Sequence, residues 1–359
     1  MLRIKIFLTA ILITLGFQAC VHKQEKPFLD MPKVDKRTEL LSIVFRLAER
    51  PEYSSKEFKL YTDRIERHFE EYKNHELIQF TKSIMDENEI GYDAVMLMAI
   101  HLDNNMKMLP DVKDIWHDLR WSKDNAEKFV SLLQKFYHDT NFDKFFKDNA
   151  DLYTEAIKRY APVYERLDLD WYRNFYGGEP TEPLLIILAP GNWVHSYGPH
   201  LEHIDGSKTI HSILGVWLFD DAGMPVFATD DYFPILLHEF IHSFVNTISE
   251  KHEDAFRESG EKLFSAVQNE MIGQSYPSWE AMVNEALVRA SIVKYMKDHN
   301  FGASEIENEI KSQKERGFFW VEKLIEELEN YDKQRNKYPA LDSFMPQLVE
   351  PYKTWTDGI

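Results

Sequence analysis

The sequence predicts an α+β protein that is mostly helical, with a small antiparallel sheet preceding a buried helix and helical lobes on either side. Three observations indicate this class. Apolar residues recur at spacings of three and four through most of the chain, which is typical of helices. Short apolar runs bounded by prolines and glycines gather within residues 183–228, which is typical of strands. Residues 235–248 are apolar on nearly all sides of a helix, and such a helix is buried.

The composition limits the class of protein and its partners. A chain of 359 residues with 44% hydrophobic and 14% aromatic residues can bury a sizeable core, in one large domain or two. The formal net charge of −18 opposes contact with a phosphate backbone, so we expect no nucleic acid as a partner and interpret the charge as a solvated surface. Because the chain has a single cysteine, it forms no disulfide framework and its stability must come from the core.

The N-terminus has the pattern of a secretion signal. Arg3 and Lys5 precede an apolar run at 6–17, which predicts a signal peptide over residues 1–19. Cys20 follows directly, and the stretch that ends there resembles a bacterial lipoprotein signal, with cleavage before Cys20 and lipid on its thiol. An ordinary signal peptide with an incidental cysteine is the alternative. We therefore expect an exported protein, lipid-anchored to a membrane of the bacterial envelope and facing the periplasm or the cell surface.

Helical patterns dominate the N-terminal half. Residues 20–34 are polar and contain prolines, so we expect them to tether the lipid to the folded part. Residues 35–170 are expected to form a helical portion of about six helices. Apolar spacing indicates helices at 39–48, 58–72, 77–85, 93–102, 126–137 and 141–167. The histidines of this portion have no metal-ligand spacing among themselves, so we interpret them as core or surface residues.

Candidate strands open the second portion, residues 171–359. Apolar or alternating runs predict strands at 183–190, 208–219 and 225–228, a hairpin turn at 220–223, and a strand or a loop at 191–198. Asp230 or Asp231 is expected to cap the helix that follows, and Pro234 suits its first turn. Further helices are expected at 250–270, 279–299 and 304–328, before an irregular tail.

The helix after the sheet contains His238-Glu239-Phe240-Ile241-His242, an HExxH pattern. Residues four apart lie on one face of a helix, so His238 and His242 can hold one metal ion. Glu239 is the next residue round and can reach a water beside that metal, which is the arrangement of zinc metalloproteases. A buried glutamate between two histidines needs a partner, and a metal ion is one. Hydrogen-bonded core histidines are the alternative.

A catalytic zinc usually has three protein ligands, and Glu285 is the best candidate for the third. It lies in the middle of the helix expected at 279–299, on an apolar stripe where a bare carboxylate is costly. The alternative is a structural ion pair with Arg289 at i+4. Glu280 is the rival ligand, but with Ser278 as N-cap it falls in the first turn, where the helix dipole alone explains a glutamate.

The HExxH helix and the Asn-Glu-Ala segment at 284–286 together resemble the gluzincin zinc metallopeptidases. The resemblance is local, covers about residues 208–290, and implies a zinc site made by both motif histidines and Glu285 in a zincin-like portion. Two departures are visible. First, 42 residues separate His242 from Glu285, which is longer than in those enzymes and would be accommodated by an inserted helix. Second, Arg289 stands where thermolysin-like enzymes place an acid that steadies a zinc-bound histidine.

Across most of the mature chain, the sequence also resembles an uncharacterised bacterial family of exported proteins, a domain of unknown function. Residues 39–48 and the HExxH helix carry this resemblance, which implies an unproven peptidase and no substrate. Together these patterns predict an exported zinc-dependent metallopeptidase that hydrolyses peptide bonds in a peptide or protein substrate. Glu239 would be the general base that takes a proton from water and passes it to the leaving amine.

A second electrophile is needed to stabilise the charged intermediate. Tyr197 and Tyr276 lie in glycine-containing loops near the motifs and are the first candidates, although each is also a plausible packing residue. The other candidates are His195, His211 and Tyr232. The strand at 208–219 is a candidate edge for an extended peptide, with a core strand as the alternative.

Two other functions stay open. A catalytically inactive zincin-fold lipoprotein could bind peptides or glycans, to which the eight tryptophans would be suited. A non-peptidase hydrolase is the second alternative, but no Gly-x-Ser-x-Gly segment supports a serine mechanism. For the peptidase, we expect the helical N-terminal portion to form one wall of the substrate cleft.

Overall fold

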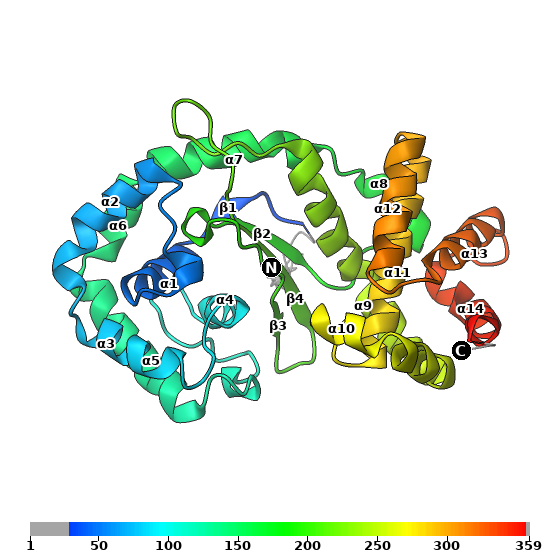
Figure 1. The fold of residues 1–359 in the computed structure, drawn as a ribbon, viewed down its shortest axis with the longest axis horizontal. Helices are drawn as coiled ribbons and strands as arrows, with labels where there is room; N and C mark the ends of the chain where they lie inside the picture. The colour runs from blue at the N-terminus through cyan, green and yellow to red at the C-terminus, as the bar shows by residue number, and fades with distance from the viewer. Residues whose placement is uncertain (1–28, 357–359) are drawn as a thin grey trace, which may run out of the picture.

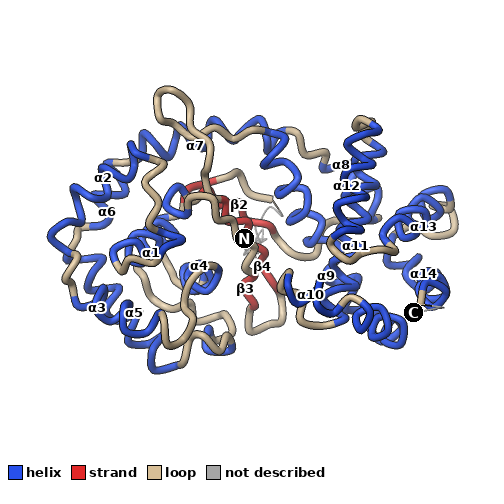
Figure 2. Tube along the Cα trace, in the orientation of Figure 1, coloured by secondary structure: helices blue, strands red, loops and turns tan. Residues whose placement is uncertain are grey.

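A small sheet lies at the centre of the fold, between two groups of helices (Figure 1). The computed structural model describes residues 29–356, so the expected signal peptide, Cys20 and the first part of the expected tether lie outside the described residues. In Figure 2 the strands form a narrow band with helices on both sides. The prediction of a mostly helical α+β protein is therefore confirmed. Within residues 29–356, no helix combines the length and the apolar character needed to cross a bilayer.

The helices and strands have the following bounds. The N-terminal helices are α1 (Lys36–Leu47), α2 (Lys59–Phe69), α3 (Glu76–Met85), α4 (Asp93–Ile100), α5 (Lys123–Asp139), α6 (Phe142–Asp148), α7 (Ala150–Glu165) and α8 (Leu169–Tyr176). The C-terminal helices are α9 (Thr229–Ala266), α10 (Gln268–Gly273), α11 (Trp279–Asp298), α12 (Ala303–Glu315), α13 (Val321–Lys333) and α14 (Leu341–Trp355). The short 3₁₀ helices are η1 (Pro51–Tyr53), η2 (Glu70–Tyr72), η3 (Ile115–His117) and η4 (Pro190–Asn192). The strands are β1 (Lys33–Val34), β2 (Leu184–Leu188), β3 (His200–Glu202) and β4 (Lys208–Leu214).

The sheet is mixed rather than antiparallel. Its order is β1-β2-β4-β3, in which β1 and β4 both run parallel to β2 and β3 runs antiparallel to β4. The expected antiparallel arrangement is therefore wrong for two of these three pairings. The reason lies in β2, which is a nearly continuous buried apolar run, as is typical of strands in parallel sheets. β1 comes from residues 33–34, which the sequence pattern placed in the tether.

Residues 197–202 run along the outer edge of the sheet beside β4, and the Lys113 amide donates to the Glu202 carbonyl on the outer side. β3 covers β4, and Tyr197 extends the pairing through a bridge with Ile213. β4 is therefore an interior strand, and the prediction that residues 208–219 form an exposed docking edge is wrong.

The segment after β4 is a turn rather than a pair of strands. Phe219 and Pro225 form a single bridge across a turn in which Gly223 has a φ of +77°. The predicted hairpin turn is thus present, but residues 225–228 do not form the predicted strand. Proline lacks the amide hydrogen that a strand ladder needs, and α9 begins directly afterwards.

Helix α9 is one element of 38 residues. The sequence pattern divided this segment into the HExxH helix and a second helix at 250–270, but no glycine or proline separates the two parts and the helix continues. Ala228 occupies the N-cap position. Asp230 and Asp231 lie in the first turn, where their negative charges interact favourably with the helix dipole. Neither side chain caps the helix.

The C-terminal tail is helical where an irregular tail was expected. Helices are present where they were expected at 304–328, as α12 and α13, which are separated near Gly317, whose φ is +100°. α14 forms despite two internal prolines. It packs against α9, with the rings of Tyr352 and Phe256 5.0 Å apart, so tertiary packing outweighs the local signal.

α9 and α11 lie in close contact, and a glycine makes that approach possible. A Cβ atom at Gly260 of α9 would lie 2.4 Å from Cε3 of Trp279, the first residue of α11. Any side chain at Gly260 would therefore push the two helices apart. Because α9 carries the HExxH motif and α11 carries Glu285, this contact helps to set the distance between them.

We expect Gly260→Ala to lower the free energy of unfolding by about 1–2 kcal/mol. Overpacking costs about 1–3 kcal/mol, which exceeds the gain of up to about 1 kcal/mol from better helix propensity. Urea denaturation measures the change. Gly273→Ala is the matched control, because no heavy atom lies within 4 Å of a Cβ at that position. Equal stability of the two variants would contradict the packing argument.

A buried acid links α1 to the loop that leads into the sheet edge. Glu39 is 0% exposed; its Oε1 accepts a hydrogen bond from the Gly191 amide at 3.4 Å, and its Oε2 has no partner in the described structure. Burial raises the pKa of Glu39 to about 8, although the Tyr61 hydroxyl and the Gly191 amide oppose the shift. The folded protein therefore holds this carboxyl in its neutral form at neutral pH.

The raised pKa of Glu39 predicts that the free energy of unfolding depends on pH. The folded pKa lies above the ordinary value of 4.5, so the contribution of Glu39 is fully present below about pH 4.5 and is lost as the pH rises through about 8. We expect Glu39→Gln to be more stable than the parent by roughly 2–5 kcal/mol at pH 9, with a much smaller difference at pH 4.5. Denaturation at both pH values tests this, with the exposed Glu57→Gln as control. A difference that does not change with pH would refute it.

Candidate metal centre

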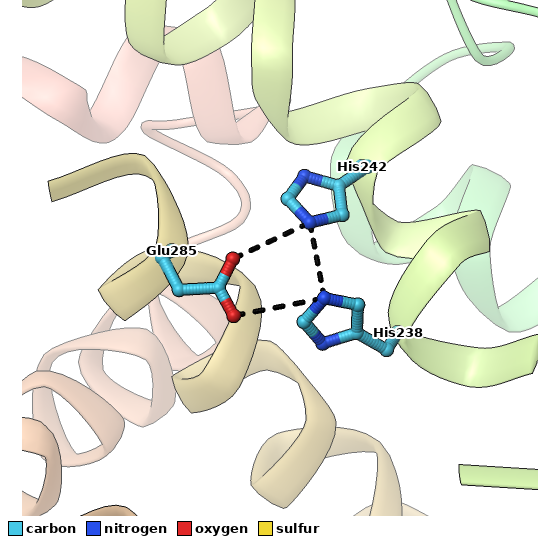
Figure 3. Close-up of side chains that lie close together, drawn as sticks. All are labelled: His238, His242 and Glu285. Atoms are coloured by element: carbon cyan, nitrogen blue, oxygen red, sulfur yellow. Dashed lines mark hydrogen bonds and ion pairs between the residues drawn. The ribbon is translucent and has the colours of Figure 1, made fainter. Parts of the chain in front are cut away.

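Two histidines from α9 and one glutamate from α11 converge on one point (Figure 3). The Nε2 atoms of His238 and His242 lie 3.2 Å apart. Oε2 of Glu285 lies 3.4 Å from His242 Nε2, and Oε1 lies 3.6 Å from His238 Nε2. One ligand atom from each residue falls within 4.8 Å of the other two. The three predicted ligands are therefore brought together, and this cluster could bind a metal ion.

The chemistry of the cluster fits a divalent metal. Two imidazole nitrogens face each other, and a carboxylate faces both, which is a set of three donors with room for a further ligand. Glu285 is only 3% exposed, and its Oε1 accepts no hydrogen bond within the described residues. The other oxygen, Oε2, faces His242 Nε2 at 3.4 Å, and a metal ion between the two would stabilise the buried negative charge.

The alternative that the sequence left open, an ion pair between Glu285 and Arg289, is also present. Arg289 Nη2 lies 2.7 Å from Glu285 Oε1, although not in hydrogen-bond geometry. The same guanidinium donates to the Tyr276 hydroxyl at 3.0 Å and to the side-chain oxygen of Gln313. The ion pair fixes the carboxylate between α9 and α11 and leaves Oε2 facing His242, so the two roles of Glu285 are compatible.

A chain of polar side chains orients His242. Its Nδ1 donates to Asn246 Oδ1 at 3.0 Å, and this leaves Nε2 directed at Glu285. Asn246 Nδ2 donates to Glu182 Oε2 at 2.9 Å, and Asn284 Nδ2 donates to Asn246 Oδ1 at 3.2 Å. Such outer partners fix the orientation of ligating histidines. The pair Asn246–Glu182 therefore orients His242 from outside the cluster.

Charges within the cluster shift the pKa values of its members. Burial lowers the pKa of His238 to about 4, although the charge of Glu285 opposes this. Burial would also lower the pKa of His242, but the hydrogen bond and the charge of Glu285 outweigh it and raise that pKa to about 9. Burial opposes ionisation of Glu285, yet the two histidines and Arg289 hold its pKa well below the usual range. A metal would replace the proton that His242 otherwise holds.

Glu239 lies beside the cluster, half-buried, under the edge of the sheet. A Cβ atom at Gly198 would lie 2.8 and 2.9 Å from its two carboxylate oxygens, so the edge segment can approach Glu239 only because residue 198 is glycine. Burial raises the pKa of Glu239 to about 7, against the charge of His242. A carboxylate with this pKa can both accept and release a proton near neutral pH.

A cavity of about 1010 Å³ opens onto the cluster and Glu239. Its lining includes residues of α4 and of the segment around η3, on the far side from α9; these are Asp93, Leu97, His117, Asp118 and Arg120. The N-terminal helical portion therefore forms one wall of this cavity, where it was expected to form a wall of the substrate cleft. Residues 196–200 of the sheet edge form another part of the lining.

The candidate electrophiles separate into two groups. Tyr197 and Tyr276 both line this cavity. Burial, with the charge of Glu285, raises the pKa of Tyr276 to about 12, while Tyr197 has a buried hydroxyl without a hydrogen-bond partner among the described residues. The other three candidates, His195, His211 and Tyr232, are not part of the lining. His211 is buried within β4, and the Tyr232 hydroxyl donates to the Gly215 carbonyl.

Sequence reasoning missed two imidazoles on the cavity wall, because His117 was interpreted as a core or surface residue and His200 was not considered. His200, the first residue of β3, lines the cavity together with His242 and Asn246. Desolvation of the ring lowers the pKa of His200. In the sequence, the only indication for His200 is its position directly after the loop that contains Tyr197. The pairing of residues 197–202 with β4 is what brings His200 near the cluster.

Comparison with known proteins identifies a family but no relative of known function. The family model described as "Domain of unknown function (DUF4932)" matches residues 31–351. Comparisons with curated proteins and with solved structures return no match.

Proposed function

Since the chain belongs to the family DUF4932, a domain of unknown function, we propose its activity from its geometry: it is an exported zinc-dependent metallopeptidase that acts on a peptide or protein. The observation that supports this proposal is the convergence of His238, His242 and Glu285 beside the half-buried Glu239, at the wall of a cavity of about 1010 Å³. Two histidines, a carboxylate and a general base are the protein groups that zinc-dependent peptide hydrolysis requires.

The protein groups would divide the work as follows. Zinc held by His238, His242 and Glu285 would polarise the substrate carbonyl and lower the pKa of a nearby water. Glu239 accepts the proton of the attacking water and returns it to the leaving amine, which suits a pKa of about 7. The Tyr276 hydroxyl accepts a hydrogen bond from Arg289, so its own proton can be donated to negative charge that develops in the cavity.

The edge segment 197–202 offers a way to align an extended peptide. Its pairing with β4 uses the backbone of Tyr197 and Pro199, so the backbone groups of Gly198 and His200 face away from β4. A peptide strand could add to this edge, with its side chains alternating between the cavity and solvent. Because Gly198 contacts Glu239, such a strand would pass directly over the general base.

A catalytically inactive lipoprotein that binds peptides is the second candidate. It is favoured by the close approach of Arg289 to Glu285 Oε1, because a positive charge at 2.7 Å competes with a metal for that oxygen. In this alternative the cluster would serve recognition, and the purified protein would bind peptides without cleaving them.

Metal analysis combined with a peptide-library digest tests the proposal. We expect about one zinc per purified chain, and cleavage that stops after chelation and returns when zinc is restored. A chain that folds normally but retains no stoichiometric metal would refute the metal site. A zinc-loaded chain that binds peptides and cleaves none would favour the binding module.

A further inference from the structure

A second cavity, of about 470 Å³, adjoins the metal centre on the His238 side. His238 and Tyr276 line both this cavity and the larger cleft, so the two spaces meet at the cluster. The inner wall is apolar and comes from α9, α11 and the loop before α12. Its side chains are Phe233, Leu237, Ile292, Met296 and Phe301. A substrate group that extends from the cleft beyond His238 would therefore enter this apolar pocket.

One charged side chain of this pocket, Arg316, has no partner among the described residues. Arg316 lies exposed at the end of α12, and within residues 29–356 its guanidinium makes no ion pair, no hydrogen bond and no contact with an aromatic face. Arg166 is 3.9 Å from Asp230 and lies over the Phe233 ring. The remaining charged groups are also engaged. Arg289 pairs with Glu285, Glu305 accepts from the Gly302 amide, and Glu309 accepts from Gln313.

The opposite side of the cluster is more negative, because three arginines and three acids line the pocket at Arg316 and their formal charges balance. A cavity of about 360 Å³ on the His242 side is lined by three acids, Glu250, Glu253 and Glu280, and by no arginine or lysine. Only Glu250 has an ion-pair partner among the described residues, Lys208. The two ends of the cleft therefore differ in charge, and a peptide would be oriented with its negative end towards Arg316.

We propose that the pocket at Arg316 receives the last residue of a peptide, and that the enzyme is a carboxypeptidase for chains that end in a large apolar or aromatic residue. The side chain fills the apolar wall, and Arg316 binds the free α-carboxylate, which is the one negative group that every peptide backbone carries. Hydrolysis breaks the amide before that residue. The hydroxyl of water joins the acyl carbon, and its proton reaches the released amine through Glu239. This inference rests on the proposed peptidase function.

Binding to a variant that cannot turn over tests the carboxylate contact. The zinc-loaded full chain carrying Glu239→Gln is titrated with an N-acetylated tripeptide that ends in phenylalanine, as the free acid and as the amide. We expect the free acid to bind at least about tenfold more tightly, as a charge-assisted hydrogen bond predicts. Adding Arg316→Gln should bring this ratio close to one. Adding Lys311→Gln, which removes the same charge from an exposed site on the same helix, should leave the ratio unchanged.

A second pair of variants tests the apolar wall. Ser312 also lines the pocket from α12, so Ser312→Trp should fill it and weaken binding of the phenylalanine peptide at least about tenfold, relative to Ser312→Ala. Three results would each overturn the inference. The first is equal affinity for the free acid and the amide, the second is equal effects of Arg316→Gln and Lys311→Gln, and the third is equal affinity of the two Ser312 variants.

Failure of this pocket assignment can be distinguished from failure of the peptidase proposal. Cleavage of internal bonds regardless of the C-terminal group refutes only the pocket assignment, whereas Arg316-dependent binding without cleavage by the parent chain refutes only the peptidase.

Discussion

Glu239→Gln should retain zinc and lose hydrolysis. The amide has the shape of the carboxylate and keeps the close contact with Gly198, so neither the helix nor the ligands should move. It cannot accept a proton, so kcat should fall by about 10²–10⁴-fold, the usual contribution of a positioned general base. Metal content measured by mass spectrometry and kcat measured on a cleaved peptide separate the two effects. The expected result is unchanged zinc with kcat near background.

An exposed acid on the same helix supplies the control. Glu258 lies on α9, pairs with Lys262 and is remote from the cluster, so Glu258→Gln removes an equal charge without touching the site. It should match the parent chain in both zinc content and kcat. If Glu239→Gln and Glu258→Gln have the same kcat, Glu239 is not the base. If Glu239→Gln loses zinc as well, its carboxylate contributes to metal binding rather than to proton transfer alone.

The three members of the cluster could be predicted because local sequence patterns indicate them. His238 and His242 are four residues apart, so any helix through them brings both rings to one face, whatever the rest of the fold does. Glu285 could be found because a carboxylate in an apolar helical stripe needs a partner, and the stripe is buried as expected. The same reasoning could not decide between metal ligand and ion pair, and the folded chain brings Glu285 to both His242 and Arg289.

The surroundings of the ligands depend on contacts that no local spacing records. Glu182 lies in the loop before β2, 64 positions before Asn246, so nothing near the HExxH motif indicates that this acid orients His242. The antiparallel arrangement of the strands was predicted wrongly for the same reason. The apolar run of β2 predicts a buried strand, but its parallel partner β4 is fixed by the path of the intervening chain, which returns as the edge segment 197–202.

Helix ends were missed where tertiary packing decides them. The segment that became α14 contains two prolines, which indicate an irregular tail when only the local sequence is considered. Its buried face packs against α9, and that burial outweighs the cost of the prolines. The uninterrupted α9 has a different cause, because no glycine or proline separates its two parts, and its second half also packs against α11 and α14.

His238→Ala and Glu285→Gln should each lose zinc while the chain still folds. Removing a ligand should weaken zinc binding by more than about 100-fold, since even partners outside the ligand shell contribute 10–100-fold. Glutamine is chosen at Glu285 because alanine would leave Arg289, which is 5% exposed, as a buried charge without a partner, at a cost of about 3–5 kcal/mol. The amide oxygen of glutamine can still face Arg289, so thermal unfolding should show a folded chain.

Glu280→Ala is the control that decides between the two candidate ligands on α11. Glu280 lies in the first turn, behind the Ser278 cap, and lines the cavity on the His242 side rather than the cluster. It should therefore retain one zinc per chain, with the affinity of the parent measured by chelator competition. Full zinc occupancy in both His238→Ala and Glu285→Gln would mean that the metal binds elsewhere. Loss of zinc in Glu280→Ala with retention in Glu285→Gln would make Glu280 the third ligand and reduce Glu285 to the partner of Arg289.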